Sequence, residues 1–339
     1  MEAKAHGPRH AIVTWGKYCG LRRPLRNPSW FLFEFSTANF EPAPTLMSTE
    51  LTLRILSGSA LFTLLFAAGL HLTPTEVWIA LRNWPRLVGL LAVNFLAVPA
   101  LTLLAVHLFQ IPPTLGLAMV LLGAAPFAPV VPVFTRLARG DLALAAGLTA
   151  VFPLFCTFLT PLVCRASLLF LPPTGELKFQ TLSILATLLA TATAPLALGV
   201  AAGQLFPGAS RRILRPAEIL SETVGAISLT FVVFSEFRTV FATGWIPVLA
   251  MVLLCEASLL MGYWLGGPSP SARVVTGLGT ANRNIALALL VAADSFPGSP
   301  VIPGVVTYGL LLIVMGVLHV GLWRLLARTA RPAAGPLIF

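Results

Sequence analysis

A guanidinium and two carboxamides, in the run Asn282-Arg283-Asn284, lie inside a stretch that is otherwise apolar enough to cross a membrane. A charged side chain at the centre of a bilayer costs about 2.5–3.5 kcal/mol on insertion scales. Because hydrocarbon alone does not accommodate that charge, a polar cavity lined by protein must surround it. Arg283 is therefore the first candidate binding residue, since a guanidinium forms two parallel hydrogen bonds with a carboxylate or sulfate.

A few other polar residues could act with Arg283. Glu256 lies in the middle of the apolar stretch 245–265 and is the candidate ion-pair partner, which would give Arg283 a structural role. Alternatively, Glu256 binds and releases a proton, because burial favours the neutral carboxyl group. Thr276 and Thr280 either line the same polar break or bond back to their own helix. The lone histidines on apolar helices, His107 and His319, are interpreted as packing or interfacial residues.

The composition places these residues in an integral membrane protein. Of the 339 residues, 57% are hydrophobic and 10% are charged, and the mean hydropathy is +0.89. Soluble globular proteins carry about 25% charged residues. A formal net charge of +10 could indicate nucleic-acid binding, but in a membrane protein it reflects orientation signals. The lipid bilayer is therefore the expected partner, and no nucleic acid is expected.

The same apolar stretches lack the usual signatures of an enzyme. They contain no nucleophile–base pair and no set of histidines and carboxylates for a catalytic metal, and the chain has no phosphate-binding loop. The four cysteines, Cys19, Cys156, Cys164 and Cys255, have no metal-type spacing, and three of them are interpreted as packing residues in apolar stretches. We expect neither enzymatic activity nor a cofactor.

About 20 apolar residues are needed to cross a bilayer as a helix, and about nine stretches qualify. They are 51–70, 86–109, 115–137, 142–171, 178–205, 218–240, 245–265, 271–294 and 301–328. The sequence therefore predicts an all-α polytopic membrane protein with about nine transmembrane helices. The run Thr73-Pro74-Thr75-Glu76 also predicts the start of a short interfacial helix, with Thr73 and Glu76 forming a capping box.

The basic residues of the loops predict the orientation in the cell (inner) membrane. Numbering the loops alternately assigns one side Arg82, Arg86, Arg136, Arg139, Arg211, Arg212, Arg215, Arg273, Arg324, Arg328 and Arg331. The other side receives only Arg54, Arg165, Lys178 and Arg238. Since cytoplasmic loops carry the excess of Lys and Arg, the C-terminus and the tail 329–339 should be cytoplasmic and the N-terminus outside.

Residues 1–46 disagree with that orientation, because this segment must lie outside although it is rich in Lys and Arg. It contains neither a convincing span nor a signal peptide. We expect it to be either a disordered extension or, if translation starts at Met47, not part of the protein. The transmembrane transporter domain is then 47–328.

Two predicted spans are interrupted at corresponding places in the two halves of the chain. In 115–137, Pro126, Pro129 and Pro132 cannot all lie in one continuous helix, since each removes a backbone hydrogen bond. In 271–294, the run 276–280 (Thr-Gly-Leu-Gly-Thr) precedes the polar residues 282–284. Paired interruptions indicate the binding site of a transporter, where half-helix N-termini project free N–H groups. Ordinary kinks are the alternative.

Three segments carry a resemblance to a known family. The run 279–288, Gly-Thr-Ala-Asn-Arg-Asn-Ile-Ala-Leu-Ala, resembles the second crossover of the bile acid:sodium symporter family. Residues 125–141 resemble its first crossover, and residues 92–99 resemble the span before it. The resemblance covers roughly 51–328 and implies inverted repeats, with two discontinuous helices crossing near the middle of the membrane. It implies a panel domain of 51–70, 178–205 and 218–240, and a core domain of 86–171 and 245–328.

The sequence departs from the sodium-coupled members of that family. Gly277 and Ala281 stand where their second crossover has a glutamate and a glutamine, and Val131-Pro132 where their first crossover has a Ser-Asn pair. Sodium, as a hard cation, needs several oxygen ligands. The set that could still form part of a sodium site is Asn94, Thr149 and Asn282, but no carboxylate remains at these positions. Arg283 could itself be a tethered cation in place of sodium.

These inferences converge on a secondary transporter of a small organic anion that works by alternating access and is not strictly sodium-coupled. The alternative is a non-transporting membrane receptor or sensor that binds an organic anion on the same scaffold. The sequence defines neither the substrate nor the oligomeric state. The candidate substrate- or ion-binding residues are Asn94, Pro126, Pro129, Thr149, Glu256, Thr276, Thr280, Asn282, Arg283 and Asn284.

Overall fold

The computed structural model describes residues 45–171 and 179–329, and its regular elements there are all helical. Most of the expected extension and tail, residues 1–44 and 330–339, lies outside the described residues. Two π-helical segments, η1 and η2, lie inside longer helices. In chain order the elements are α1 (Thr45–His71), α2 (Pro74–Arg82), α3 (Trp84–Ala92), η1 (Val93–Ala97), α4 (Val98–Leu108), α5 (Pro113–Gly123), α6 (Val131–Ala138), α7 (Leu142–Leu168), α8 (Thr181–Leu188), η2 (Leu189–Thr193), α9 (Ala194–Leu205), α10 (Pro207–Phe241), α11 (Trp245–Leu265), α12 (Pro270–Ala281), α13 (Ile285–Ser295) and α14 (Val301–Thr329).

Among the described residues, 7 helical runs are long and apolar enough to cross a membrane. They are Leu51–His71, Trp84–Leu108, Leu142–Leu168, Thr181–Leu205, Pro207–Arg238, Trp245–Leu265 and Val301–Leu326. The two other predicted spans are the ones expected to be interrupted. The span 115–137 is divided between α5 and α6, and 271–294 is divided between α12 and α13. The prediction of an all-α polytopic membrane protein is confirmed.

The short helix after the first span begins where the sequence predicts. The Thr73 hydroxyl accepts a hydrogen bond from the Glu76 backbone N–H at 3.3 Å, and the Glu76 carboxylate accepts one from the Thr73 N–H at 2.9 Å. Pro74 occupies the first helical turn, where a missing N–H loses no hydrogen bond. The capping box therefore starts α2, which packs against α7.

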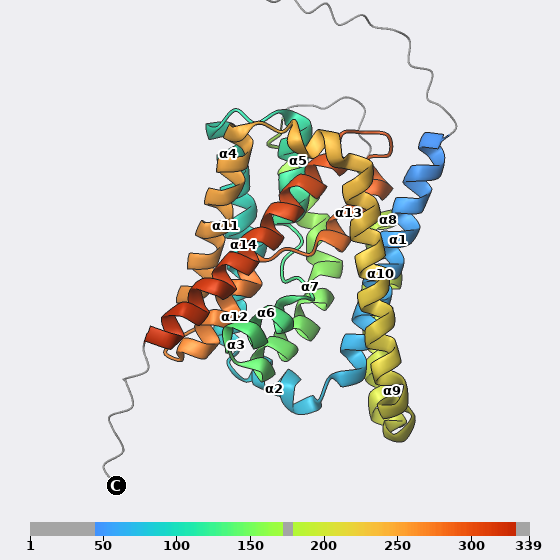
Figure 1. Ribbon diagram of the computed structural model, residues 1–339, viewed down its shortest axis with the longest axis vertical. Coiled ribbons are helices and arrows are strands. Elements are labelled where there is room, and N and C mark those ends of the chain that lie inside the picture. The colour runs from blue at the N-terminus through green and yellow to red at the C-terminus, as the bar shows by residue number, and fades with distance from the viewer. Residues whose placement is uncertain (1–44, 172–178, 330–339) are drawn as a thin grey trace, which may run out of the picture. The chain divides into compact units, whose positions relative to one another are not determined.

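The long helices pack closely, and α1 and α10 also contact α13 and α14, respectively. Helix α1 packs against α9 and α10, and Figure 1 shows α1 and α10 side by side. Helix α11 packs against α12, while α14 packs against α5, α6 and α13 and crosses the view diagonally in Figure 1. The helices of the expected panel thus contact one another. The division into a panel and a core remains a prediction.

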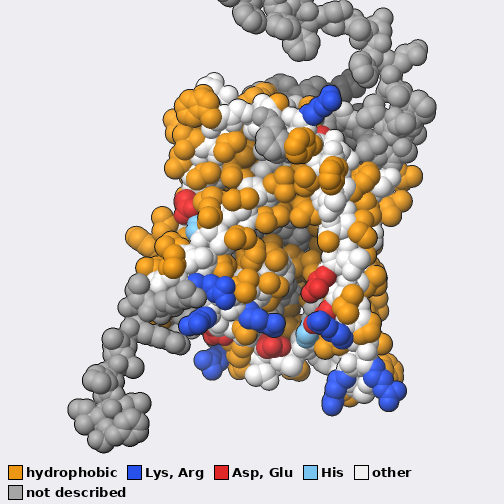
Figure 2. Space-filling model, viewed as in Figure 1, with side chains coloured by type: hydrophobic (Ala, Val, Ile, Leu, Met, Phe, Trp, Pro, Cys, Tyr) orange, Lys and Arg blue, Asp and Glu red, His pale blue; other side chains and the backbone are white. Residues whose placement is uncertain are grey.

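Basic side chains gather at one end of the described helices. Figure 1 places α2, the ends of α6 and α14, and the turn between α9 and α10 at the same end. Figure 2 shows most of the Lys and Arg side chains of this face there, below a surface that is largely hydrophobic. These elements carry the arginines that predict the cytoplasmic side, while the orientation in a membrane stays a prediction.

Candidate functional site

The two interrupted helices meet through their backbones. Pro126 and Arg283 form an antiparallel bridge. The Ala128 N–H donates to the Asn282 carbonyl at 3.1 Å, and the Asn284 N–H donates to the Ala125 carbonyl at 2.8 Å. Irregular backbone inside a membrane must have its polar groups satisfied by protein. Each break supplies hydrogen bonds to the other, so the crossover holds together as a unit.

Local sequence explains why the chain breaks here. Helix α5 ends at Gly123, and α6 begins only at Val131 with Pro132 in its first turn. Phe127 between them has a positive φ of 62°, which is unusual for a residue with a side chain. Its ring fills the space beside Gly279, where an added Cβ would be 1.9 Å from Phe127 Cε2. Gly279 therefore permits the close approach of the two breaks.

Arg283 lies at the centre of this crossover and is 2% exposed. Its Nη1 donates to Asn94 Oδ1 at 3.1 Å and to the Gly123 carbonyl at 3.3 Å. Gly123 ends α5, where the last carbonyls lack helical partners and carry partial negative charge. The second nitrogen, Nη2, is buried without a hydrogen-bond partner in the described part of the chain. Neutral oxygen atoms thus bind the guanidinium through Nη1 and not through Nη2 among the described residues.

The expected ion pair between Arg283 and Glu256 is wrong. The Glu256 carboxylate is hydrogen-bonded to His319 Nε2 at 2.8 Å, and its side chain is 40% exposed. Within residues 45–171 and 179–329, no carboxylate forms a salt bridge with Arg283. His319, interpreted from sequence as a packing residue, is therefore a polar partner that sequence reasoning missed. The available signal was a lone histidine and a lone glutamate on separate apolar helices.

Asn94 connects the crossover to the neighbouring helix. It is fully buried in the π-helical segment η1, and π-helical turns occur frequently at functional sites. Its Nδ2 donates to the Leu90 carbonyl at 2.9 Å and to Thr280 Oγ1 at 3.2 Å, while its Oδ1 accepts from Arg283. One carboxamide thus contacts both α12 and the break that follows it.

The remaining candidate residues lie in different local environments. Asn284 caps α13, because its Oδ1 accepts from the Leu287 N–H at 3.1 Å. Asn282 Nδ2 and Thr276 Oγ1 bond back to their own helix, at 2.9 Å to Leu278 O and 3.1 Å to Ala272 O. Pro129 lies in the turn that leads into α6. Thr149 Oγ1 on α7 is buried without a partner among the described residues.

Two members of the possible sodium set, Asn94 and Asn282, already have hydrogen-bond partners in this structure. The Asn94 oxygen is used by Arg283, and the Asn282 side chain is bonded to its own helix through Nδ2. In the described ranges there is also no group of three or more His, Cys, Asp or Glu side chains that could hold a metal ion. The residues at these positions therefore do not fit a sodium ion as they stand, since the best oxygen ligand already contacts a guanidinium.

Aromatic rings support the first break from the α7 side. Phe127 stacks on Phe152 with ring centroids 4.5 Å apart, and Phe152 also stacks on Phe95, which lies beside Asn94 in η1, at 6.4 Å. Phe127 and Phe152 are fully buried. Such stacked pairs contribute about 0.5–1.5 kcal/mol beyond the burial of their area. They fix Phe127 in its unusual backbone conformation and hence the position of the crossover.

A cleft of about 540 Å³ opens between α7 and α9. Leu72 and Val77 close it on the α1–α2 side, and Ala150 and Val151 line it from α7. The amide of Gln204 is its one polar side chain. This volume is in the range of small-molecule sites, about 300–1,000 Å³, which are usually apolar with few polar groups.

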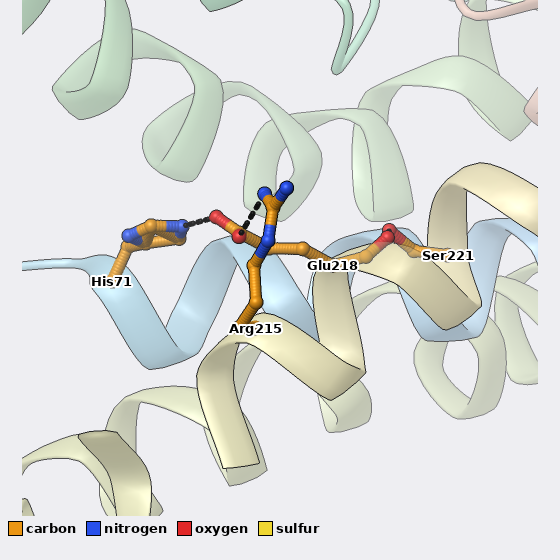
Figure 3. Close-up of polar contacts among 4 residues, drawn as sticks. All are labelled: His71, Arg215, Glu218 and Ser221. Atoms are coloured by element: carbon orange, nitrogen blue, oxygen red, sulfur yellow. Dashed lines mark hydrogen bonds and ion pairs between the residues drawn. The ribbon is translucent and has the colours of Figure 1, made fainter. Parts of the chain in front are cut away.

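Polar clusters join helices at the two ends of the fold. At one end, the Arg54 guanidinium forms a salt bridge with Asp294, and Ser183 Oγ donates to the same carboxylate at 3.3 Å. This links α1 and α8 to the end of α13. At the other end, Figure 3 shows the Glu218 carboxylate of α10 between His71 of α1, at 2.7 Å, and Arg215, at 3.3 Å.

The helical fold, the paired broken helices and the buried guanidinium at their crossing define a polytopic membrane protein with a transporter-type crossover. The sequence model of the Sodium Bile acid symporter family matches residues 59–244, which is more than half of the chain. The chain belongs to this family, which is a family of transporters. The matched residues include Asn94 and the first break, whereas Arg283 lies beyond them. No curated protein matches the chain.

Proposed function

We propose that the chain is a secondary transporter of a small organic anion that works by alternating access without a strict requirement for sodium. The observation that carries the proposal is the Arg283 guanidinium, buried where the two broken helices cross and bonded to Asn94 Oδ1 and the Gly123 carbonyl. These are neutral oxygen atoms of the kind that a hard cation would need. Arg283 thus supplies a fixed positive charge in the place of a coupling cation.

The position of the charge supports this role. Helices α5 and α12 both end at the crossover, at Gly123 and Ala281, and the C-terminal end of a helix carries partial negative charge. Two such ends stabilise a cation between them. Because Glu256 bonds to His319, its carboxylate does not neutralise this cation.

The same geometry leaves one nitrogen of Arg283 for binding an anionic substrate. Nη2 of Arg283 has no hydrogen-bond partner among the described residues, and a guanidinium binds a carboxylate or sulfate best through two nitrogens. An anionic group that reached Nη2 would neutralise the buried charge. We propose that the apolar part of the substrate occupies the cleft between α7 and α9. The name of the family makes bile acids the first anions to examine.

Contacts at the two ends are consistent with one state of an alternating-access cycle. The Arg54–Asp294 salt bridge and Ser183 hold α1 and α8 against α13 at one end. The cleft lies at a different place, between α7 and α9. In the proposed cycle the salt bridge breaks when that end opens.

The test is binding and uptake by the purified full chain. A thermal-shift screen against bile acids and smaller organic carboxylates and sulfonates identifies ligands, and uptake of the best ligand into proteoliposomes is then measured in sodium, potassium and choline. We expect binding and uptake to persist in all three salts. A steep, saturable dependence on sodium would contradict the role given to Arg283. Binding without flux would instead indicate a receptor or sensor.

A further inference from the structure

A second polar group lies within the membrane-spanning part, outside the crossover. Glu256 lies near the middle of α11, and its Oε1 is 2.8 Å from Nε2 of His319 on α14. Both residues belong to helical runs that are long and apolar enough to cross a membrane. We therefore expect the pair to lie within the thickness of the bilayer.

The two side chains differ in their surroundings. Glu256 shares one face of α11 with four exposed apolar residues, at spacings of three or four residues that place them on one side of a helix. They are Leu249, Leu253, Leu260 and Trp264. The Glu256 carboxyl group, 40% exposed, thus lies on an apolar exposed face of α11. The His319 side chain is only 8% exposed, and its Nδ1 is buried without a partner among the described residues.

One proton makes this pair neutral. With a single shared proton it is either a carboxylic acid beside a neutral imidazole or a carboxylate beside an imidazolium, and both forms have no net charge. Removal of the proton leaves one negative charge facing hydrocarbon, which is costly. We infer that Glu256 and His319 form a proton-binding site inside the membrane, and that the site exchanges its proton as the proposed transporter changes conformation.

The crossover contacts the same helix one turn away. Gly316 lies three residues before His319 on α14, and a Cβ at Gly316 would be 2.8 Å from Asn282 Oδ1 and 2.5 Å from Phe134 Cε2. Packing this close leaves little room for α14 to move independently of the crossover. Helix α11 is packed as closely against α12, since a Cβ added at Gly262 would lie 2.3 Å from the Thr276 carbonyl oxygen, so Glu256 and His319 move together with the crossover. This step rests on the proposed function.

Among the described residues no other charged group bonds to either partner. Helices α11 and α14, which carry the pair, and the elements packed against them carry further titratable or charged side chains. They are Arg86 on α3, His107 on α4, Arg136 on α6, Arg211, Arg212, Arg215, Glu218, Glu222, Glu236 and Arg238 on α10, Cys255 and Tyr263 on α11, Arg273 on α12, Arg283 at the crossover, Asp294 on α13, and Tyr308 and Arg324 on α14.

Proton binding can be measured without any substrate, on the full chain in lipid nanodiscs. The Trp323 ring lies 6.2 Å from the His319 ring, and a protonated imidazole quenches indole fluorescence. Fluorescence is recorded from about pH 5 to about pH 9, the interval that brackets imidazole titration. The variants are Glu256→Gln, His319→Gln and Trp323→Phe. The matched controls are His107→Gln and Glu222→Gln.

We expect a pH-dependent change in the wild type that His319→Gln and Trp323→Phe both lack. Glu256→Gln should also alter the curve, because the carboxylate that bonds to the His319 imidazole is gone. Both controls should retain the wild-type curve. A curve that His319→Gln leaves unchanged, or the absence of any change in the wild type, would overturn the proton site.

Proton exchange during the conformational change is tested by cross-linking α1 to α13 at positions 54 and 294. Cysteines in the variant Arg54→Cys, Asp294→Cys are joined by a bis-maleimide, and the fluorescence response to a pH jump is compared before and after joining. We expect the response to slow by about fivefold or more. An unchanged rate would disprove the link to conformation. If anion uptake persists but His319→Gln leaves the titration unchanged, the proton site is refuted and the proposed function stands. If the titration is intact but no uptake occurs, the proposed function is refuted and the proton site stands.

Discussion

Arg283 donates a hydrogen bond from Nη1 to Oδ1 of Asn94 at 3.1 Å, across a separation of 189 residues in the sequence. The contact joins the second break to the π-helical turn of a helix in the first half of the chain. Asn94 also donates to Thr280, so one buried carboxamide holds both the guanidinium and the end of α12. The binding properties of the crossover should therefore depend on Arg283 and on this contact.

Replacement of Arg283 by alanine should weaken anion binding and uptake more severely than it lowers expression. A hydrogen bond to a charged group contributes about 1.5–3 kcal/mol, so affinity for the anion found in the thermal-shift screen should fall about tenfold to a hundredfold. Arg283→Lys keeps the charge but loses the planar fork. Partial activity of Arg283→Lys would favour the tethered-cation role. No activity would favour recognition of the anion by two parallel hydrogen bonds.

A matched double variant separates Arg283 from Glu256. Because Glu256 bonds to His319, Glu256→Gln should not restore the function lost in Arg283→Gln. The measurement is anion uptake by the two single variants and the double variant. Recovery in the double variant would mean that the two charges neutralise each other after all.

For the single variant Arg283→Ala, wild-type affinity for the anion would show that this residue takes no part in the mechanism.

Gly279→Ala should destabilise the fold. The new Cβ would lie 1.9 Å from Phe127 Cε2, and overpacking of a filled core costs about 1–3 kcal/mol. Thermal unfolding of the purified protein measures the effect as a lower Tm. Gly225→Ala is the control, because nothing lies within 4 Å of its added Cβ. Phe127→Leu should recover part of the loss, and equal Tm values for the two alanine variants would show that Phe127 does not constrain Gly279.

Breaking the Arg54–Asp294 salt bridge should favour the state that is open at that end. The Arg54 side chain is 45% exposed, so the pair contributes only about 0.2–1 kcal/mol and less at high salt. In Asp294→Asn, maleimide should label Ile184→Cys, which is buried in the wild-type structure, up to about five times faster. Arg215→Gln is the control, since its ion pair lies within α10. Equal labelling rates would mean that the salt bridge does not hold this end closed.

The orientation can be tested with single cysteines at opposite ends of α10. In a Cys19→Ser background, Ala209→Cys should resist a membrane-impermeant maleimide in intact cells and react after permeabilisation. Ala242→Cys, in the turn after α10, should react from outside. Both positions are exposed, whereas Cys156, Cys164 and Cys255 are buried. The opposite pattern would reverse the orientation predicted from the basic residues.

Features that depend on short stretches of chain could be predicted from the sequence. Apolar stretches long enough to cross a membrane predicted the class of protein. The prolines at 126 and 129 and the polar residues 282–284 predicted where two spans break, whereas Gly277 and Gly279 lie inside α12 and do not interrupt it. Thr73 and Glu76 predicted the start of α2, and the structure forms that capping box. Each of these rests on hydrogen bonds or sterics within a few residues, which the local sequence determines.

The partners of buried polar groups were decided only by the tertiary structure. Arg283 contacts Asn94 and Gly123, and Glu256 contacts His319, although the sequence made Glu256 the natural partner of Arg283. A hydrogen bond requires two atoms about 3 Å apart, which depends on how each helix is rotated about its axis. In an amphipathic helix the polar face indicates that rotation, but transmembrane helices are apolar on nearly all sides. The rotation, and with it the choice of partner, is therefore determined by packing between helices.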